Sequence, residues 1–340
     1  MTDMRVVVVI PNWNEKEALA RCLESLQSQS RKVTIVVVDN GSIDNSAGMV
    51  QQSFPDVKLI RNPKNLGFTG GVNPGLQWAI DKNYDYAALL NNDAVADERW
   101  AEYLTEFMES HPKAGIATSK ICDLKKTHLD STGEGYSVWG LSFPRGRGEP
   151  FSGKYDKDTW IFGASGGASI YRTEMLRQIG LFDDDFFAYY EDVDISFRAQ
   201  LAGWKVAYVP KALVYHEIGA TSAKIKGFTT YQTMKNLPQV VVKNAPGKLF
   251  WSVGLRFKLA YWSFFFSAIS RGQGWPALKG LLMALVLVPK KLNQRHKIQK
   301  NRKVSVDYIE SIITHDLPPN AHKLRRLRHY WFKLTGMGRR

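Results

Sequence analysis

Residues 5–40 read RVVVVIPNWNEKEALARCLESLQSQSRKVTIVVVDN and set the architecture of the chain. The runs Arg5–Ile10 and Val33–Val38 are β-branched without alternation, which predicts strands buried on both faces of a parallel sheet. Between them, Glu15–Gln29 has an apolar stripe at helical spacing, formed by Leu19, Cys22, Leu23 and Leu26. The order strand, helix, strand is a βαβ unit.

The same alternation continues beyond this unit. We expect a helix after Ser42, a strand at Val57–Ile60, a helix near Gly75–Lys82 and a strand at Tyr86–Leu90. Asn14 is expected to cap the first helix, with Glu17 as its capping-box partner. Further along, the composition of Lys125–Trp160 predicts loops and short antiparallel strands. We expect a helix beginning near Glu191 and a strand at Val206–Val209 after this region. The fold class is therefore α/β, with a Rossmann-like, mostly parallel sheet flanked by helices.

The positive charge of the chain is concentrated at its C-terminal end. From Lys243 onward there are 20 Lys and Arg against 3 Asp and Glu, whereas the first 242 residues have 26 against 29. We therefore divide the chain into an α/β domain, residues 1–242, and a helical basic segment, residues 243–340. Helix-turn-helix, RRM and zinc-finger patterns do not occur, so we expect no nucleic-acid partner.

The basic segment also contains two apolar stretches, Phe250–Ile269 and Leu278–Val288. They are too short or too interrupted for a membrane span, and their mixture of aromatic and basic residues is typical of helices lying in a membrane interface. The cluster Lys290–Lys303 and the tail Lys323–Arg340 would then meet anionic headgroups. The alternative is a helical subdomain that packs on the α/β domain and exposes a basic face to water.

The N-terminus and the cysteines bear on localisation. Residues 1–5 run directly into the first strand, so no secretory leader is expected. Cys22 and Cys122 have no disulfide or zinc spacing, which favours a reducing compartment. We expect a cytoplasmic protein, peripheral on the inner face of the cytoplasmic membrane.

Polar residues follow three of the predicted strands, at the sheet edge where α/β proteins bind ligands. Asp39 ends the second strand and can accept a hydrogen bond from the N3–H of uracil or thymine. The loop Asn62–Gly75 has four glycines, which allow a ligand to approach the backbone closely. Asp93 ends Asn91-Asn92-Asp93 and is suited to holding Mg²⁺ or Mn²⁺ against a diphosphate, with His216 as a candidate further ligand.

The densest acidic group is Glu191-Asp192-Val193-Asp194, at the predicted helix start. Asp194 and Arg198 are one helical turn apart, which predicts a structural salt bridge. Glu191 and Asp192 could stabilise the helix dipole. Alternatively, the neighbouring aromatic residues 186–190 could raise the pKa of one carboxyl toward that of a general base.

Taken in order, these motifs resemble the inverting family 2 glycosyltransferases with the GT-A fold, in particular the rhamnosyltransferase-like enzymes. The resemblance covers residues 5–222 and rests on PNWNE, VDNGSIDNS, NLGFTGGVNPG, LLNND, GASGGASIYR, FFAYYEDVDISFR and YHEIGATS.

The resemblance implies a role for each motif. The residues that would bind the nucleoside are Pro11, Asn14, Glu15 and Asp39. Those that would line the donor pocket are Asn65, Gly67, Gly71 and Asn73. Asn91 and Asn92 stand with Asp93 at the place of the family's Asp-x-Asp motif, where Asn91 replaces the first Asp. Asp93 and His216 would bind the divalent cation, and Asp192, or else Glu191, would be the catalytic base.

The activity implied is transfer of L-rhamnose from dTDP-rhamnose to a lipid-linked or saccharide acceptor in cell-surface polysaccharide biosynthesis. Three alternatives stay open: a UDP-sugar-dependent glycosyltransferase of the same fold, a non-catalytic glycosyltransferase-like scaffold, and a nucleotidyltransferase. The last would normally have a glycine-rich loop directly after its first strand, where this chain has PNWNE.

Overall fold

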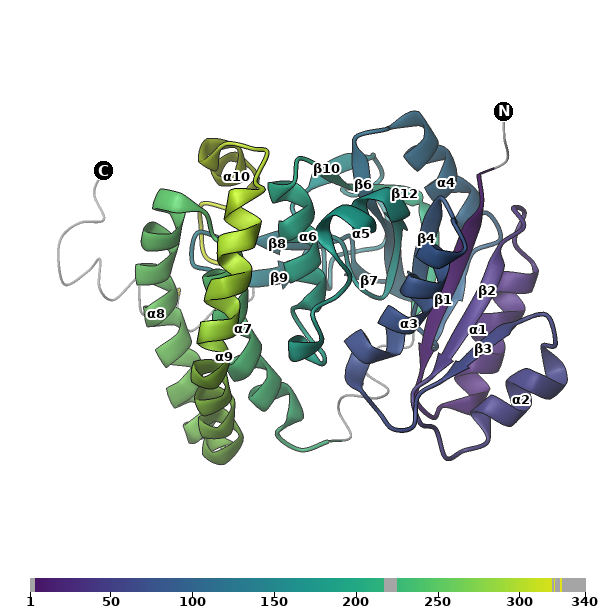
Figure 1. Cartoon of the computed structure of the whole chain (residues 1–340), viewed down its shortest axis with the longest axis horizontal. Coiled ribbons are helices and arrows are strands. Elements are labelled where there is room, and N and C mark those ends of the chain that lie inside the picture. Colours follow the sequence, from purple (N-terminus) through teal and green to yellow (C-terminus); the bar gives the residue numbers. More distant parts are fainter. Residues whose placement is uncertain (1–3, 217–224, 320, 322–324, 326–340) are drawn as a thin grey trace. The chain divides into compact units, whose positions relative to one another are not determined.

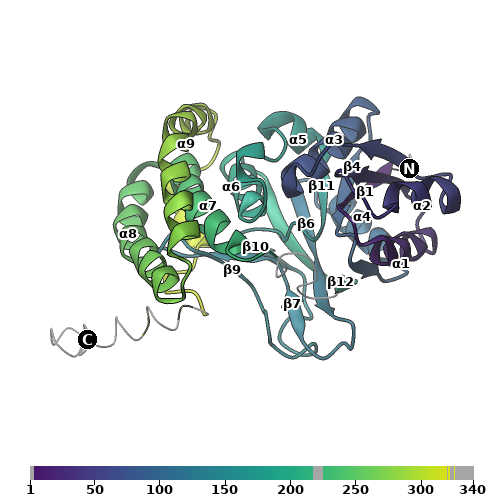
Figure 2. The same ribbon diagram turned by 90° about the horizontal axis from the view of Figure 1, so that it is seen from below.

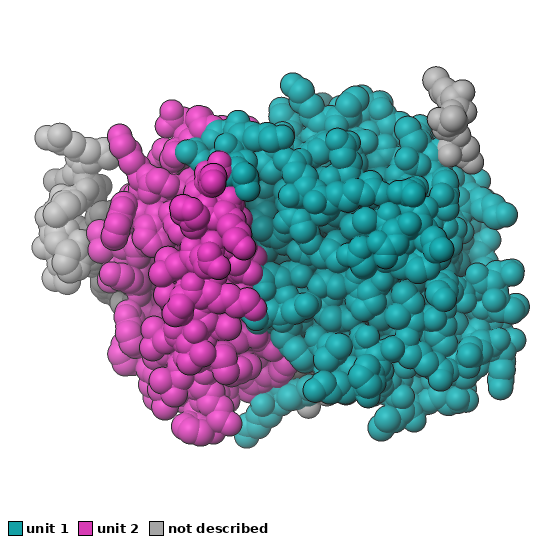
Figure 3. Space-filling model, in the orientation of Figure 1, with its two compact units in different colours: residues 1–134, 144–226, 301–304 teal, residues 135–143, 227–300, 305–340 magenta. Residues whose placement is uncertain are grey.

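The computed structural model describes residues 4–216, 225–319, 321 and 325. The chain forms two compact units (Figure 3). Unit 1 comprises residues 1–134, 144–226 and 301–304, and unit 2 comprises residues 135–143, 227–300 and 305–340. The boundary expected between residues 242 and 243 therefore differs from the observed one, because unit 2 already begins at Gly227 and includes a short earlier segment.

Unit 1 is built on a mixed sheet with the strand order β10-β12-β6-β11-β4-β1-β2-β3, in which β5 pairs with β12 and β7 with β6. β1, β2, β3 and β4 are mutually parallel, as expected, and β11 enters antiparallel between β4 and β6. The strands are β1 (Val6–Asn12), β2 (Thr34–Asp39), β3 (Lys58–Arg61), β4 (Tyr86–Leu90), β5 (Ala94–Ala96), β6 (Ala114–Asp123), β7 (Leu129–Ser131), β10 (Thr159–Ile161), β11 (Ala168–Arg172) and β12 (Lys205–His216).

Helices cover both faces of this sheet (Figures 1 and 2). In β1, Val6, Val8 and Ile10 pack in one apolar cluster, and Val7 and Val9 pack in another. This is why the strand has no polar alternation. The first cluster includes α1 (Lys16–Gln27), α2 (Ser46–Ser53) and α4 (Trp100–Ser110). The second includes α3 (Gly67–Asp81), α5 (Thr173–Ile179) and α6 (Glu191–Leu201).

Two local predictions were wrong. The N-cap of α1 is Glu15, with φ 61°, and no side chain caps the helix there. Asp44 takes that role from another loop, because its Oδ2 accepts the Lys16 amide at 2.9 Å. The glycine-rich segment is also not a loop throughout, since α3 begins at Gly67. Gly75 lies inside this helix. The residue at this position has to be a glycine, because a Cβ there would lie 2.5 Å from Val9 Cγ1.

Unit 2 is mainly helical, as the C-terminal composition predicts. Its helices are α7 (Phe228–Asn244), α8 (Gly247–Ser270), α9 (Gly274–Lys300) and α10 (Val306–Ile312), and the first three run side by side (Figures 1 and 2). The short strands β8 (Glu134–Tyr136) and β9 (Ser142–Pro144) pair with each other. None of the helices in the described part of the chain is long and apolar enough to cross a bilayer. Most of the basic tail 323–340 lies outside the described residues.

Candidate active site

The loops after β1 and β2 are joined by hydrogen bonds between their polar side chains. Ser42 Oγ accepts the Asn14 amide at 2.8 Å and Asn12 Nδ2 at 3.2 Å. Asn14 Oδ1 accepts the Ile43 amide at 3.0 Å. Asn14 and Glu15 both have φ of 61°, a left-handed conformation that non-glycine residues rarely adopt. Backbone strain of this kind is often found at functional sites.

Asp39 is the last residue of β2 and pairs in register with Asn12 of β1. Its side chain is buried, and its Oδ1 has no hydrogen-bond partner among the residues that the structure describes. A buried carboxylate oxygen without a partner costs free energy, and a ligand that donates a hydrogen bond to it would remove that cost. Asp39 is therefore placed to accept a hydrogen bond from a molecule at this edge of the sheet.

Asn40 fixes the start of α3 beneath this edge. Its Nδ2 donates to Asn65 Oδ1 at 3.1 Å and to the Gly67 carbonyl at 2.9 Å. Gly71 leaves room for Pro11, since a Cβ there would lie 3.1 Å from Pro11 Cβ. The structure thus brings Pro11, Asn65, Gly67 and Gly71 together around Asn40. Asn12 and Asn40, which bridge these loops, were not singled out from the sequence.

Asn73 is placed differently from the rest of its motif. Its Nδ2 donates to the Phe182 carbonyl at 2.9 Å and to Asp184 Oδ1 at 2.8 Å, and its Oδ1 accepts the Phe182 amide at 3.1 Å. All these partners lie in the segment that leads to α6. The side chain therefore holds that segment against α3.

The Asn91-Asn92-Asp93 turn directly follows β4. The Asn91 amide donates to the Gly167 carbonyl at 2.9 Å, and Asn92 Nδ2 donates to Asn12 Oδ1 at 2.8 Å. Asp93 alone of the three carries a charge, and its Oδ1 lies 3.1 Å from His216 Nε2. These two residues meet because β5, which follows Asp93, pairs with the end of β12 so that His216 is opposite Ala94.

His216 lies between two carboxylates, Asp93 and Asp130. Its Nδ1 is 3.1 Å from Asp130 Oδ2. Burial lowers the pKa of the imidazole, but the hydrogen bonds to Asp130 and Asp93 outweigh this effect and raise the pKa to about 9. The pKa of Asp130 is lowered, because its hydrogen bond to His216 and the charge of Arg147 outweigh burial. Asp130 lies in the irregular region 125–160 and was not found from the sequence.

Asp93 and His216 have suitable donor atoms for a hard divalent cation. Two neighbouring ligands of one octahedral Mg²⁺ ion lie about 3 Å apart, which matches the 3.1 Å between Asp93 Oδ1 and His216 Nε2. Within the described ranges, no group of three His, Cys, Asp or Glu side chains has the arrangement of a metal site. These two residues therefore fit a cation that is also held by another ligand, such as a diphosphate. Glu217, next in sequence, lies outside the described residues.

Asp192 is next to Asn91 across a short loop, residues 165–167. Asp192 Oδ2 accepts the Gly166 amide at 3.2 Å, while the next residue, Gly167, accepts the Asn91 amide. Asp192 Oδ1 accepts the Val193 amide at 2.8 Å. Burial raises the pKa of Asp192 despite these two hydrogen bonds, which lower it. The carboxylate therefore has the raised basicity that suits a general base.

Glu134 is a second carboxyl in this neighbourhood that the sequence did not reveal. Its pKa is raised well above the ordinary value, first by burial and then by the charge of Asp192. The negative charge of Asp192 therefore favours the protonated form of Glu134.

Elsewhere in the acidic motif, the predicted pair Asp194–Arg198 is confirmed. Arg198 Nε lies 2.9 Å from Asp194 Oδ2, and both side chains are buried. Arg198 also donates to the carbonyls of Ile179 and Leu181. Asp194 thus has a structural role. Glu191, also buried, begins α6.

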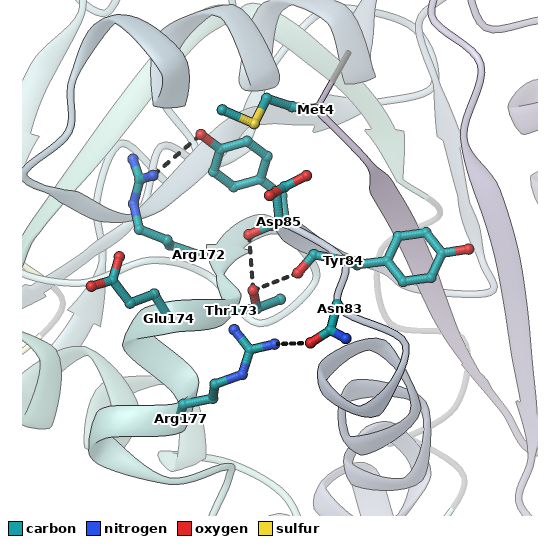
Figure 4. Close-up of a pocket in the computed structure, with 9 residues that line it drawn as sticks. Met4, Asn83, Tyr84, Asp85, Arg172, Thr173, Glu174 and Arg177 are labelled. Carbon is teal, nitrogen blue, oxygen red and sulfur yellow. Dashed lines mark hydrogen bonds between the residues drawn. The ribbon is translucent and has the colours of Figure 1, made fainter. Parts of the chain in front are cut away.

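A pocket of about 220 Å³ lies at the opposite edge of the sheet, at the amino ends of β1 and β4 (Figure 4). Its two arginines are engaged in holding the fold. Arg172 donates to the carbonyls of Ala114 and Met108, and Arg177 donates to the Ile80 carbonyl and Asn83 Oδ1. The candidate active site is instead at the carboxyl ends of the strands, where α/β sheets bind ligands.

Comparison with known proteins agrees with this geometry. The family model described as Glycosyl transferase family 2 matches residues 7–180, just over half of the chain. The N-acetylglucosaminyl-diphospho-decaprenol L-rhamnosyltransferase of Mycobacterium tuberculosis is 28% identical over 246 residues, covering 64% of this chain and 76% of that protein. A poly-beta-1,6-N-acetyl-D-glucosamine synthase of Staphylococcus epidermidis is 24% identical, covering 60% of this chain and 47% of the synthase.

Solved structures share the fold. S. aureus TarS 1-349 in complex with UDP-GlcNAc superposes with a TM-score of 0.56 at 16% identity, covering 91% of this chain and 92% of that one. The mannosyltransferase PcManGT from Pyrobaculum calidifontis, in complex with GDP-Man and Mn2+, superposes with a TM-score of 0.53 at 14% identity. The match covers 88% of this chain and 86% of that one. The expected GT-A fold is confirmed. The chain belongs to glycosyl transferase family 2 and is a glycosyltransferase.

Proposed function

We propose that this glycosyltransferase transfers L-rhamnose from dTDP-rhamnose, with inversion, to a lipid-linked or saccharide acceptor in cell-surface polysaccharide synthesis. The named activity of the M. tuberculosis relative supports both the sugar and the lipid-linked acceptor. The observation that carries the nucleotide assignment is the buried Oδ1 of Asp39 at the end of β2, which has no hydrogen-bond partner in the described part of the chain. This oxygen can accept a hydrogen bond from a base that has an N–H at the facing position, as thymine and uracil have at N3.

Asp192 is the proposed catalytic base. Its carboxylate removes the proton from an acceptor hydroxyl, and the hydroxyl oxygen attacks the anomeric carbon as the bond from that carbon to the diphosphate breaks. Attack from the face opposite the leaving group inverts the configuration. Asp93 and His216 would hold a divalent cation, which would stabilise the negative charge that develops on the departing diphosphate.

Removal of the Asp39 carboxylate tests the nucleotide assignment. We expect Asp39→Ala to weaken dTDP binding by about 10–100-fold, because a hydrogen bond to a charged group contributes about 1.5–3 kcal/mol. Native protein should prefer dTDP to dCDP by at least about tenfold, since cytosine has no N–H at N3. Isothermal titration calorimetry measures both, with Asp81→Ala as a control at an exposed carboxylate on α3. Equal affinity of the native protein for dTDP and dCDP would contradict the assignment.

The proposed membrane partner is supported by the outer faces of α8 and α9. Large apolar side chains are exposed at helical spacing, including Trp251, Leu255, Leu259, Trp262, Phe266 and Ile269 on α8 and Trp275, Leu278, Leu282, Leu285, Val286 and Leu292 on α9. Neither helix contains an Asp or Glu, while both contain Lys or Arg. An apolar stripe with basic neighbours fits an anionic bilayer surface better than a second copy of the same positive surface.

Flotation with liposomes tests this partner. We expect the native protein to float with phosphatidylglycerol vesicles, and the triple change Leu255→Ser, Leu259→Ser and Phe266→Ser to reduce the bound fraction at least about tenfold. These side chains are 71%, 63% and 62% exposed, so the fold should survive. Leu124→Ser, at a 57% exposed leucine of unit 1, is the matched control. Native protein that stays wholly in the aqueous fraction would rule out this partner.

A further inference from the structure

The imidazole of His216 is held from both sides by residues of different strands. Nε2 faces Asp93 Oδ1 and Nδ1 faces Asp130 Oδ2, each at 3.1 Å. Asp130 is the middle residue of β7, and His216 is the last of β12. Both strands pair with β6, so the sheet itself fixes the distance between the two side chains. The contact is therefore built into the fold.

Asp130 is itself anchored, by Arg147. Arg147 Nη2 lies 3.0 Å from Asp130 Oδ1, and Arg147 Nε donates to the Asp130 backbone carbonyl at 3.1 Å. The two carboxylate oxygens are thus divided: Oδ1 faces Arg147 and Oδ2 faces the imidazole. The Arg147 side chain is 59% exposed, so the ion pair alone contributes little to stability. Its evident consequence is to fix the orientation of the Asp130 carboxylate.

We propose that Asp130 is a positioning residue, which accepts the Nδ1–H of His216 and thereby presents the Nε2 lone pair to a cation shared with Asp93. The inference rests on the metal role proposed above for Asp93 and His216. A cation that binds Nε2 takes the place of the proton there, and the neutral imidazole keeps its one N–H on Nδ1, where Asp130 accepts it. Carboxylates commonly hold metal-binding histidines in this way.

Asp130 acts through the ring in this arrangement. It contacts Nδ1, the nitrogen turned away from Asp93, so a cation bound by Asp93 Oδ1 and His216 Nε2 lies on the other side of the imidazole. An effect of Asp130 on metal binding therefore has to pass through His216. This separates Asp130 from the residues that would contact the cation.

The test is a double-mutant cycle read out as Mn²⁺ affinity. Mn²⁺ binding to the full chain, with dTDP present, is measured by calorimetry or electron paramagnetic resonance for wild type, Asp130→Asn, His216→Ala and the double variant. We expect Asp130→Asn to weaken Mn²⁺ binding by about 10–100-fold. The change should add almost nothing in the His216→Ala background, because the ring through which Asp130 acts is gone. The affinity for dTDP without metal should stay within about twofold of wild type.

Two further variants separate positioning from a loss of folding. Arg147→Gln frees the Asp130 carboxylate while retaining it, and it should weaken Mn²⁺ binding in the same direction by a smaller factor. Asp156→Asn, which removes the carboxylate paired with Lys120, should leave Mn²⁺ binding unchanged. An Asp130→Asn protein that binds Mn²⁺ as wild type does, or losses that are additive in the double variant, would overturn the positioning role alone. A wild-type chain that binds no Mn²⁺ would overturn the proposed metal role as well.

Discussion

Replacing Asp192 by asparagine is expected to lower the turnover number by about 10²–10⁴-fold, the usual contribution of a positioned general base. The amide keeps the shape of the side chain but cannot accept the proton of the acceptor hydroxyl. Donor binding should change little, because Asp192 acts on the acceptor. Single-turnover kinetics with saturating donor measure the loss directly, and calorimetry with dTDP reports donor binding separately.

The pH dependence follows from the same residue. The base works only when ionised, so kcat/KM should rise with pH through the pKa of Asp192. Because burial raises that pKa, the rise should be centred above about 4, the ordinary value for Asp. Asp81→Asn, at an exposed carboxylate on α3, should retain the native rate and profile. Near-native turnover in both Asp192→Asn and Glu191→Gln would show that neither residue is the base.

Asp93→Ala is expected to lower kcat/KM by about 10²–10³-fold, equivalent to about 3–4 kcal/mol of transition-state stabilisation. Asp93 is the only carboxylate of the turn Asn91-Asn92-Asp93. Raised Mn²⁺ should not restore the native rate, because the remaining partner, His216, supplies a single donor atom. Activity measured against Mn²⁺ concentration gives both quantities. An Asp93→Ala enzyme with native kcat/KM and native Mn²⁺ dependence would remove Asp93 from the metal site.

Much of unit 1 could be predicted because its signals are local. The runs before Pro11 and Asp39 are buried on both faces, and the sequence between them has one clear helical stripe. The start of α3 could not be predicted, because its glycines have low helix propensity and favour a loop. Gly67 and Gly75 occur in that helix for tertiary reasons, since a Cβ would collide with the Phe187 carbonyl at 2.3 Å and with Val9.

The candidate site shows the same division between local and non-local information. Asp39 and Asp93 follow strands that the sequence predicts, so their edge of the sheet could be foreseen. The contacts around His216 could not be foreseen. Asp130 lies 86 residues before His216 in the sequence, and the two side chains meet only because β7 and β12 flank β6. Glu134, in the same irregular region, owes its raised pKa to burial and to Asp192, neither of which leaves a periodic signal.

The most direct test of the proposed function measures release of nucleoside diphosphate from a panel of dTDP-, UDP- and GDP-sugars. Each donor is incubated with and without Mn²⁺ or Mg²⁺, and with and without a membrane-lipid extract as the source of acceptor. We expect release from dTDP-rhamnose that requires both the cation and the extract. Release only from a UDP-sugar would contradict the donor assignment. No release from any donor, together with no nucleotide binding by calorimetry, would contradict the proposed function as a whole.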